Sequence, residues 1–286
     1  MCRLYGLHAT HPTRAACELI DAQNALIRQS VEDARGLSNP DGWGLGRIHD
    51  GTAACFRQVG PASEDASYRT EALRMQGELL LAHVRRATVG TPTRANTHPF
   101  RSGHAMLIHN GHLPAFDAVR PALLDALPPG HRSAIQGTTD SEHVFALLLH
   151  EREQHPDAPL HVVTRRVAQQ VQAWCDAVPE TNAPRPHPEL DVDLHAVGLN
   201  LLWTDGTTLA ASRLHRSLYV LERTEPRVCP ICNSAHATPA DDRPYRAVVV
   251  ASEPITNEDW QPVPNGSVLS VSPRAERTIE PLAPSS

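Results

Sequence analysis

Cys2 is the residue with the clearest capacity for chemistry, because it stands second in the opening segment MCRLYGLHAT. An aminopeptidase removes an initial Met that precedes a small residue, and this would leave Cys2 with a free α-amino group. Such a group titrates near about 7.7 to 8.0, so its neutral fraction can take the thiol proton. Cys2 is therefore a candidate nucleophile with its own base, although an incidental buried thiol gives the same pattern.

Further polar residues could bind a substrate that carries charged groups. Arg85 follows the apolar run ELLLAHV, and a guanidinium holds a carboxylate through paired hydrogen bonds. Asp140 opens a helical pattern, where it could accept from an ammonium group, cap the helix, or do both. Asn110 and Gly111 follow another apolar run, and an Asn-Gly pair at such a place is most often a tight turn.

The order of these residues resembles that of the class II glutamine amidotransferases, a family of N-terminal-nucleophile hydrolases. Five segments carry the resemblance over roughly residues 1 to 145. They are MC at the start, NPDGWG at 39–44, AHVRRATVG at 82–90, THPF at 97–100 with HNG at 109–111, and TTDSE at 138–142. Their common order and spacing indicate more than a chance match.

The resemblance implies a role for each matched residue. Cys2 would attack a γ-glutamyl amide, with Asn110 and Gly111 as the oxyanion pair. The glutamyl end would be bound by residues from three segments, which are Arg85, Thr88, His98 and Asp140. The expected product is glutamate, released from a thioester on Cys2, and no cofactor is expected.

The resemblance also bears on the substrate. The residues after the matched half are those that the family fold itself needs, so we expect a stand-alone domain without a synthase. The segments VRRATVGTP and NPDGWG are most similar to the branch that includes the γ-glutamyl hydrolase of ergothioneine biosynthesis and a glutathione-degrading component. Arg86 stands where sugar-phosphate-aminating members carry Trp, whereas His98 is kept. Glutamine and other γ-glutamyl compounds both stay open as substrates.

A second cysteine motif, CPICNSAH, places Cys229, Cys232 and His236 at C-x₂-C-x₃-H spacing. These residues could supply three zinc ligands, but a structural zinc site needs four. Cys175 or another histidine could complete the site, or the two cysteines could be plain thiols in a turn. We assign no metal from the sequence, and the other histidines lack metalloenzyme spacing.

The elements that would position these residues can be predicted from periodicity. Helices are expected over 13–33, from about 140, and over about 160–178, with a surface connector at 179–191. Strands are expected at 78–90 and at 104–113, where Asn-Gly ends the strand, and again near 195–204, 207–213, 217–222, 246–251 and 267–271. The resemblance implies an α+β fold, a four-layer αββα sandwich. We expect one domain over 1–273 and a flexible tail over 274–286.

Composition excludes several functions. All 26 basic residues are Arg, which removes P-loop, kinase and pyridoxal chemistry that depends on Lys. The formal charge of −6, spread along the chain, argues against nucleic acid or anionic membranes as partners. The absence of a secretory or membrane-spanning apolar run predicts a cytoplasmic protein with reduced thiols. The expected partner is a small γ-glutamyl substrate, with a homodimer or a separate synthase left open.

Three other interpretations compete with this one. A papain-like protease would need a Cys at a mid-chain helix start, and Cys17, Cys55 and Cys175 lack that setting. A metal or redox module built on Cys229 and Cys232 would make Cys2 irrelevant. A non-catalytic subunit, or a glutaminase subunit that passes ammonia to a synthase, would use the same fold.

Overall fold

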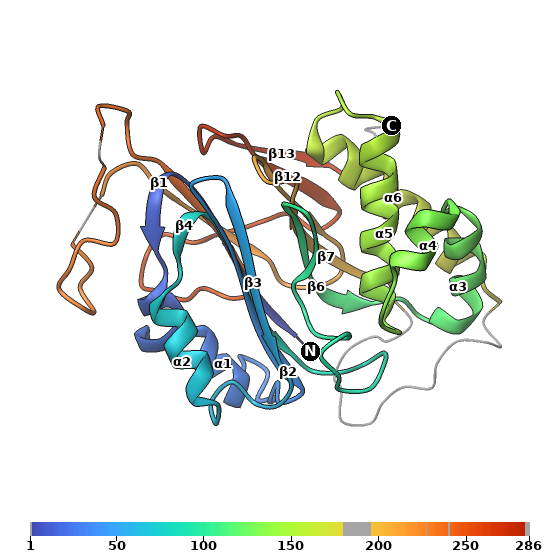
Figure 1. Ribbon diagram of the computed structural model, residues 1–286, viewed down its shortest axis with the longest axis horizontal. Helices are drawn as coiled ribbons and strands as arrows, with labels where there is room; N and C mark the ends of the chain where they lie inside the picture. Colours follow the sequence, from blue (N-terminus) through green and yellow to red (C-terminus); the bar gives the residue numbers. More distant parts are fainter. Residues whose placement is uncertain (1, 180–195, 227, 240, 284–286) are drawn as a thin grey trace.

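The computed structural model describes residues 2–179, 196–226, 228–239 and 241–283. Two antiparallel sheets pack face to face, with α1 and α2 outside one sheet and α3 to α6 outside the other (Figure 1). This is the predicted four-layer αββα arrangement, so the predicted fold class is confirmed. Most of the predicted connector at 179–191 lies outside the described residues.

The first sheet has seven strands, and its long central strands bring the start of the chain beside the end of β4. Tyr5 in β1 is paired with Ala82 in β4 and with Ala251 in β10. The order across the sheet is β11 (Gln261–Pro262), β9 (Tyr219–Arg223), β10 (Ala247–Ala251), β1 (Arg3–Arg14), β4 (Gln76–Arg85), β2 (Gly42–His49) and β3 (Thr52–Gln58).

The second sheet has six strands and carries the Asn-Gly segment in its middle. Its order is β13 (Arg277–Pro281), β12 (Ser267–Val271), β8 (Leu209–Arg213), β7 (Gly198–Thr204), β6 (Ala105–His112) and β5 (Phe100–Ser102). Leu107 in β6 lies opposite Trp203 in β7 and Phe100 in β5.

Helices cover the two outer faces. On the first sheet lie the π-helical turn η1 (Cys17–Asp21), α1 (Leu26–Val31) and α2 (Ala66–Leu73). On the second lie α3 (Phe116–Asp125), α4 (Pro129–Ala134), α5 (Asp140–Gln154) and α6 (Leu160–Asp176). Thr139 caps α5 by accepting from Glu142 N–H at 3.2 Å, which satisfies one of the free donors at the helix start.

Three apolar cores separate the four layers. The middle core joins the inner faces of the two sheets, with Leu4, Leu79 and Leu81 against Ile108 and Leu202. A strand covered on both faces must be apolar on both faces. This explains why the continuous run ELLLAHV forms the buried β4 rather than an alternating surface strand.

The structure corrects three predictions about elements. Residues 13–33 do not form one helix, because β1 runs to Arg14 and only the short η1 and α1 follow. Gly111 does not end its strand, since β6 continues through it to His112. Residues 277–281 form β13, paired with β12, instead of belonging to a flexible tail.

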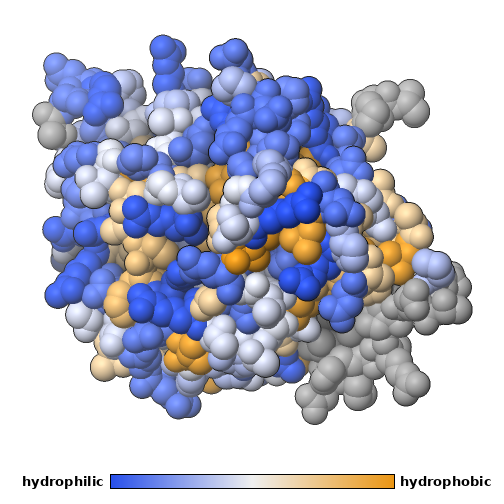
Figure 2. Space-filling view, turned by 45° about the vertical axis from the view of Figure 1, so that its right-hand side comes forward, coloured by the Kyte–Doolittle hydropathy of each residue, from blue (hydrophilic) through white to orange (hydrophobic). Residues whose placement is uncertain are grey.

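Among the described residues, no helix has both the length and the apolar character needed to cross a bilayer. Figure 2 shows one face of the molecule, on which hydrophilic residues separate the apolar residues into several patches. Isolated apolar surface of this kind is normal for a folded domain.

Candidate active site

Cys2 lies directly before β1 and faces the backbone of Arg86, which directly follows β4. Its Sγ donates to Arg86 O at 3.3 Å and accepts from Arg86 N–H at 3.4 Å. Only 8% of Cys2 is exposed. Burial raises the pKa of the Cys2 thiol, while the Arg86 N–H and the charges of Arg85 and Arg3 oppose this effect. The thiol therefore needs a base to become a nucleophile.

Arg3 holds the backbone of Cys2 in place. Its Nη1 donates to Cys2 O at 3.0 Å. Its Nη2 lies 2.6 Å from the Asp33 carboxylate, and its Nε lies 2.6 Å from the Glu253 carboxylate. All three charged side chains are buried. A buried cation paired with two carboxylates holds one geometry, because any other arrangement leaves a desolvated charge. We did not single out Arg3 from the sequence, where its position after Cys2 was the available signal.

Asn110 reaches across from the second sheet to the strands that frame Cys2. Its Nδ2 donates to Ser252 Oγ at 3.2 Å, and the same oxygen accepts from Leu4 N–H at 3.1 Å. Ser252 N–H in turn donates to Leu4 O at 3.0 Å. The Asn110 amide is thus tied to a residue two positions after Cys2. Ser252 has no sequence signal that would have identified it.

Gly111 is required by close strand packing. A Cβ built on Gly111 would lie 1.9 Å from the carbonyl oxygen of Gly198 in β7. Only glycine allows β6 and β7 to approach this closely, because any other side chain would collide with that backbone. The Asn-Gly pair is therefore a strand feature here, and the turn that the sequence left open is excluded.

Arg85 ends β4 and organises the loop that follows it. Its guanidinium donates to the carbonyl oxygens of Val89 at 2.9 Å, Gly90 at 3.0 Å and Thr91 at 3.3 Å. Thr88, on the same loop, is exposed. The buried guanidinium thus donates to loop carbonyls through the same two nitrogens that would bind a carboxylate.

Asp140 is the first residue of α5 and ties this helix to the end of β6. Its Oδ2 accepts from Leu113 N–H at 2.8 Å, and its Oδ1 accepts from Ser141 N–H at 2.7 Å and Ser141 Oγ at 3.2 Å. A carboxylate has about four acceptor positions, so these contacts leave room on Oδ2 for a further donor.

Asn96 connects the Arg85 loop with the segment before Asp140. It is buried, accepts from Thr138 N–H at 2.7 Å, and donates to Thr91 O at 3.0 Å. Since Thr91 O also accepts from Arg85, the side-chain amide of Asn96 connects the Arg85 loop with the segment before Asp140. Sequence reasoning missed Asn96 because nothing in a lone Asn before a loop Thr indicates this contact.

His98 lies in a buried cluster of rings. Its ring centroid is 4.3 Å from that of His83 and 4.6 Å from that of Phe100. Within the described part of the chain, neither ring nitrogen has a hydrogen-bond partner. Burial holds the pKa of His98 well below its usual value, so the ring is neutral. Its place in this cluster accounts for a packing role, and a role in binding substrate stays a prediction.

The three residues of the second cysteine motif lie at the opposite end of β1 from Cys2. Arg14 N–H, at the end of β1, donates to His236 O at 2.9 Å. Cys229, Cys232 and His236 come together there with Cys17. Cys175 does not join them, because it belongs to α6 and packs against the core of the second sheet.

Comparison with known proteins agrees with this architecture. A family model described as glutamine amidotransferases class-II matches residues 1–279. The chain is 28% identical to the probable glutamine amidotransferase DUG3 of Saccharomyces cerevisiae, over 95% of this chain and 82% of that protein. It is 27% identical to the gamma-glutamyl-hercynylcysteine sulfoxide hydrolase of Mycobacterium tuberculosis, over 89% and 86%.

A solved structure shows the same fold. The glutamine aminotransferase class-II domain protein of Silicibacter pomeroyi superimposes with a TM-score of 0.62 at 22% identity, covering 99% of this chain and all of that one (100%). Sequence and fold therefore lead to one assignment. The chain belongs to the class II glutamine amidotransferases.

Proposed function

We propose that this protein hydrolyses the γ-glutamyl amide bond of a small substrate through a thioester on Cys2. One observation carries the proposal. The Cys2 thiol is buried where the ends of β1, β4 and β6 converge, with the Asn110 amide tied through Ser252 to the backbone beside it. The names of the yeast and mycobacterial relatives support glutamine and γ-glutamyl compounds as the substrate class.

The proposed reaction begins when Met1 is removed and the α-amine of Cys2 takes the thiol proton. The thiolate attacks the γ-carbonyl carbon, and the oxygen becomes an oxyanion held by the Asn110 amide and the Gly111 N–H. Collapse forms the thioester and expels the amine, which receives the proton from the α-ammonium group. The α-amine of Cys2, neutral again, then activates a water that hydrolyses the thioester and releases glutamate.

The glutamyl head group is proposed to bind between two charges of opposite sign. Asp140 has an acceptor position left on Oδ2 for the substrate ammonium group. Arg85 takes the substrate carboxylate in place of the loop carbonyls that it holds without substrate. Asn96 keeps these two parts of the site in register through Thr91 and Thr138.

Two assays test the proposal. Glutamate release is measured from glutamine, glutathione and other γ-glutamyl compounds, with wild-type protein, Cys2→Ala and Cys175→Ala. We expect turnover to be lost only in Cys2→Ala, and acid-quenched wild-type protein to carry a γ-glutamyl adduct on the Cys2 peptide. Retention of Met1 in the active protein, measured by intact mass, would refute the mechanism.

The same substrate panel separates hydrolysis from ammonia donation. A stand-alone hydrolase cleaves a γ-glutamyl compound larger than glutamine without any added protein. An ammonia-donating subunit would instead act on glutamine alone and would be accelerated by its synthase. The second result would favour the alternative function while leaving the role of Cys2 intact.

A further inference from the structure

A cluster of three thiols and one imidazole lies beside the end of β1, at the opposite end of that strand from Cys2. The Sγ atoms of Cys17, Cys229 and Cys232 and a ring nitrogen of His236 all lie within 4.8 Å of one another. Ligand atoms around a tetrahedral zinc are about 3.8 Å apart, as follows from Zn–S bonds of about 2.3 Å. Cys232 Sγ and His236 Nε2, at 3.4 Å, are already close to that spacing.

The backbone holds the two motif cysteines in a tight turn. Asn233 N–H donates to Cys229 O at 2.9 Å, and Cys229 N–H donates to Ser234 O at 2.9 Å. Asn233 adopts a positive φ of 52°, which an Asn tolerates better than most residues. The turn therefore presents both thiols to one side without depending on contacts between the thiols themselves.

The other two members of the cluster lie at the end of β1, where Cys17 follows the strand and His236 is bound to it. Cys17 begins η1, three residues after the end of that strand, and Arg14 N–H fixes the backbone of His236 at 2.9 Å. Thr13 also forms a bridge with Ala237. Segments more than 200 residues apart in the sequence are thus held together beside the thiols.

The carboxylate of Glu18 lies next to the ring of His236. Glu18 Oε2 lies 3.7 Å from His236 Nδ1, on the side of the ring away from the thiols. Glu18 Oε1 is held by Arg223 at 3.0 Å, and Arg223 is held in turn by Glu258 at 2.8 Å. Metal-bound histidines commonly have such a carboxylate on the second nitrogen, because it fixes the ring and its tautomer.

We propose that Cys17, Cys229, Cys232 and His236 bind one structural Zn²⁺ as a Cys₃His site. A fully protein-supplied set of ligands is the pattern of structural rather than catalytic zinc. Cys17, Cys229 and His236 also line a surface cavity, which gives the ion a path of entry. The zinc fastens the 228–236 turn to the first sheet and takes no part in cleavage at Cys2, which is more than roughly 30 Å away along β1.

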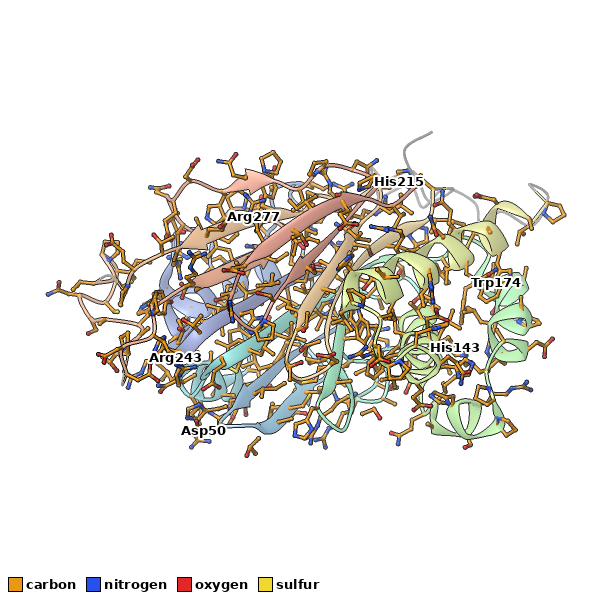
Figure 3. All side chains as sticks on the ribbon, turned by 90° about the horizontal axis from the view of Figure 1, so that it is seen from above. Asp50, His143, Trp174, His215, Arg243 and Arg277 are labelled. Carbon is orange, nitrogen blue, oxygen red and sulfur yellow. The ribbon has the colours of Figure 1, made fainter. Side chains whose placement is uncertain are left out.

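Two other cysteines, Cys55 and Cys175, lie outside this cluster. Cys175 lies in α6 beside Trp174, and Figure 3 shows Trp174 and Arg243, which follows the cysteine turn in sequence, at opposite ends of the molecule. Cys55 lies in β3, where its Sγ contacts Pro99 O at 3.6 Å. These two residues therefore serve as matched cysteine controls.

Metal analysis of the full chain tests the proposal. We expect one zinc per chain by mass spectrometry, and thiolate-to-cobalt charge transfer with tetrahedral bands after Co²⁺ substitution. Cys17→Ser and Cys229→Ser should lose the zinc, whereas Cys55→Ser and Cys175→Ser should keep it. Wild-type protein without zinc after expression in zinc-replete medium, or with a disulfide in the cluster by intact mass, would overturn the proposal.

Two further variants keep the test decisive. His236→Cys should keep a tetrahedral site, now with four thiolates, so its cobalt spectrum should show stronger charge transfer than that of wild type. This result does not depend on whether the serine variants fold. Cys2→Ala should retain full zinc while losing turnover. Loss of zinc in Cys2→Ala, or an unchanged cobalt spectrum in Cys17→Ser, would contradict the assignment of these ligands.

Discussion

The side-chain amide of Asn110 and the backbone N–H of Leu4 donate to the same hydroxyl oxygen, that of Ser252. Asn110 belongs to β6 of the second sheet, Leu4 belongs to β1 of the first, and Ser252 directly follows β10. One oxygen therefore sets the position of the proposed oxyanion donor relative to β1, which directly follows Cys2.

Ser252→Ala should lower kcat more than it raises KM. The substitution removes the acceptor for two buried donors, so it should also reduce the free energy of unfolding by about 1–3 kcal/mol. Asn110 would keep its amide but lose its orientation, and we expect kcat to fall by about tenfold. Steady-state kinetics and urea unfolding measure the two effects. Ser252→Cys, which keeps the shape and a weak acceptor, should recover part of the rate; equal rates in both variants would argue against positioning.

Asn110→Ala should reduce kcat by about 10²- to 10³-fold, the usual effect of removing one oxyanion donor. Substrate affinity should change little, because the donor acts mainly on charge that develops during the reaction. Asn257→Ala is a suitable control, since Asn257 is exposed and contacts Gln23. A near-normal kcat in folded Asn110→Ala would remove Asn110 from the proposed mechanism.

Arg3→Met should destabilise the protein by about 3–5 kcal/mol, because Asp33 and Glu253 would remain buried without their cation. Arg74→Met provides the comparison, since Arg74 pairs with Glu71 but its side chain is 66% exposed. An exposed pair of this kind contributes about 0–1 kcal/mol. Chemical unfolding of both variants checks the difference, and similar losses in both would show that the Arg3 pairs contribute little.

Stability should fall as the pH is lowered from about 6.5. Burial lowers the pKa of His83 to about 3, below that of the unfolded chain, so the unfolded state binds the extra proton in the interval between these values. The stabilisation is present above the unfolded pKa and is lost as the pH falls toward the folded one. From pH 7 to pH 5, His83 alone should account for about 2 kcal/mol.

His83→Gln measures this contribution. Gln does not titrate and can still donate toward His109 O, which His83 Nε2 contacts at 3.0 Å. The variant should therefore lose about 2 kcal/mol less than wild type between pH 7 and pH 5. His104→Gln, a change at an exposed residue, should follow the wild-type pH dependence. Parallel curves for wild type and His83→Gln would contradict the prediction.

The sequence predicted the parts of the site that depend on local pattern. The β4 run ending in Arg85 and the start of the helix at Thr139 and Asp140 follow from apolar periodicity and helix capping. The family resemblance supplied the fold class and directed attention to Cys2 and Asn110. Asn110 and Gly111 were read locally as the end of a strand, because the approach of Gly198 O to Gly111 is a property of two strands and not of one.

Residues that act through long-range contacts could not be predicted. Arg3 meets Glu253, and Asn110 meets Ser252, over 250 and 142 residues of sequence respectively. Cys17 was seen only as a thiol without a catalytic setting, although it lies with Cys229, Cys232 and His236 in the folded chain. Spacing within one segment reveals three members of this cluster, and only the pairing of β1 with the rest of the sheet brings in the fourth.

The contacts of Arg85 with its own loop have a thermodynamic consequence. Any carboxylate that takes this guanidinium competes with the carbonyls of Val89, Gly90 and Thr91 for the same nitrogens. Its measured binding free energy is therefore less favourable than the intrinsic one, by the free energy that is needed to displace the loop. Since that loop begins at Arg86, whose backbone contacts Cys2 Sγ, a carboxylate that displaced the loop would also change the contacts of the thiol.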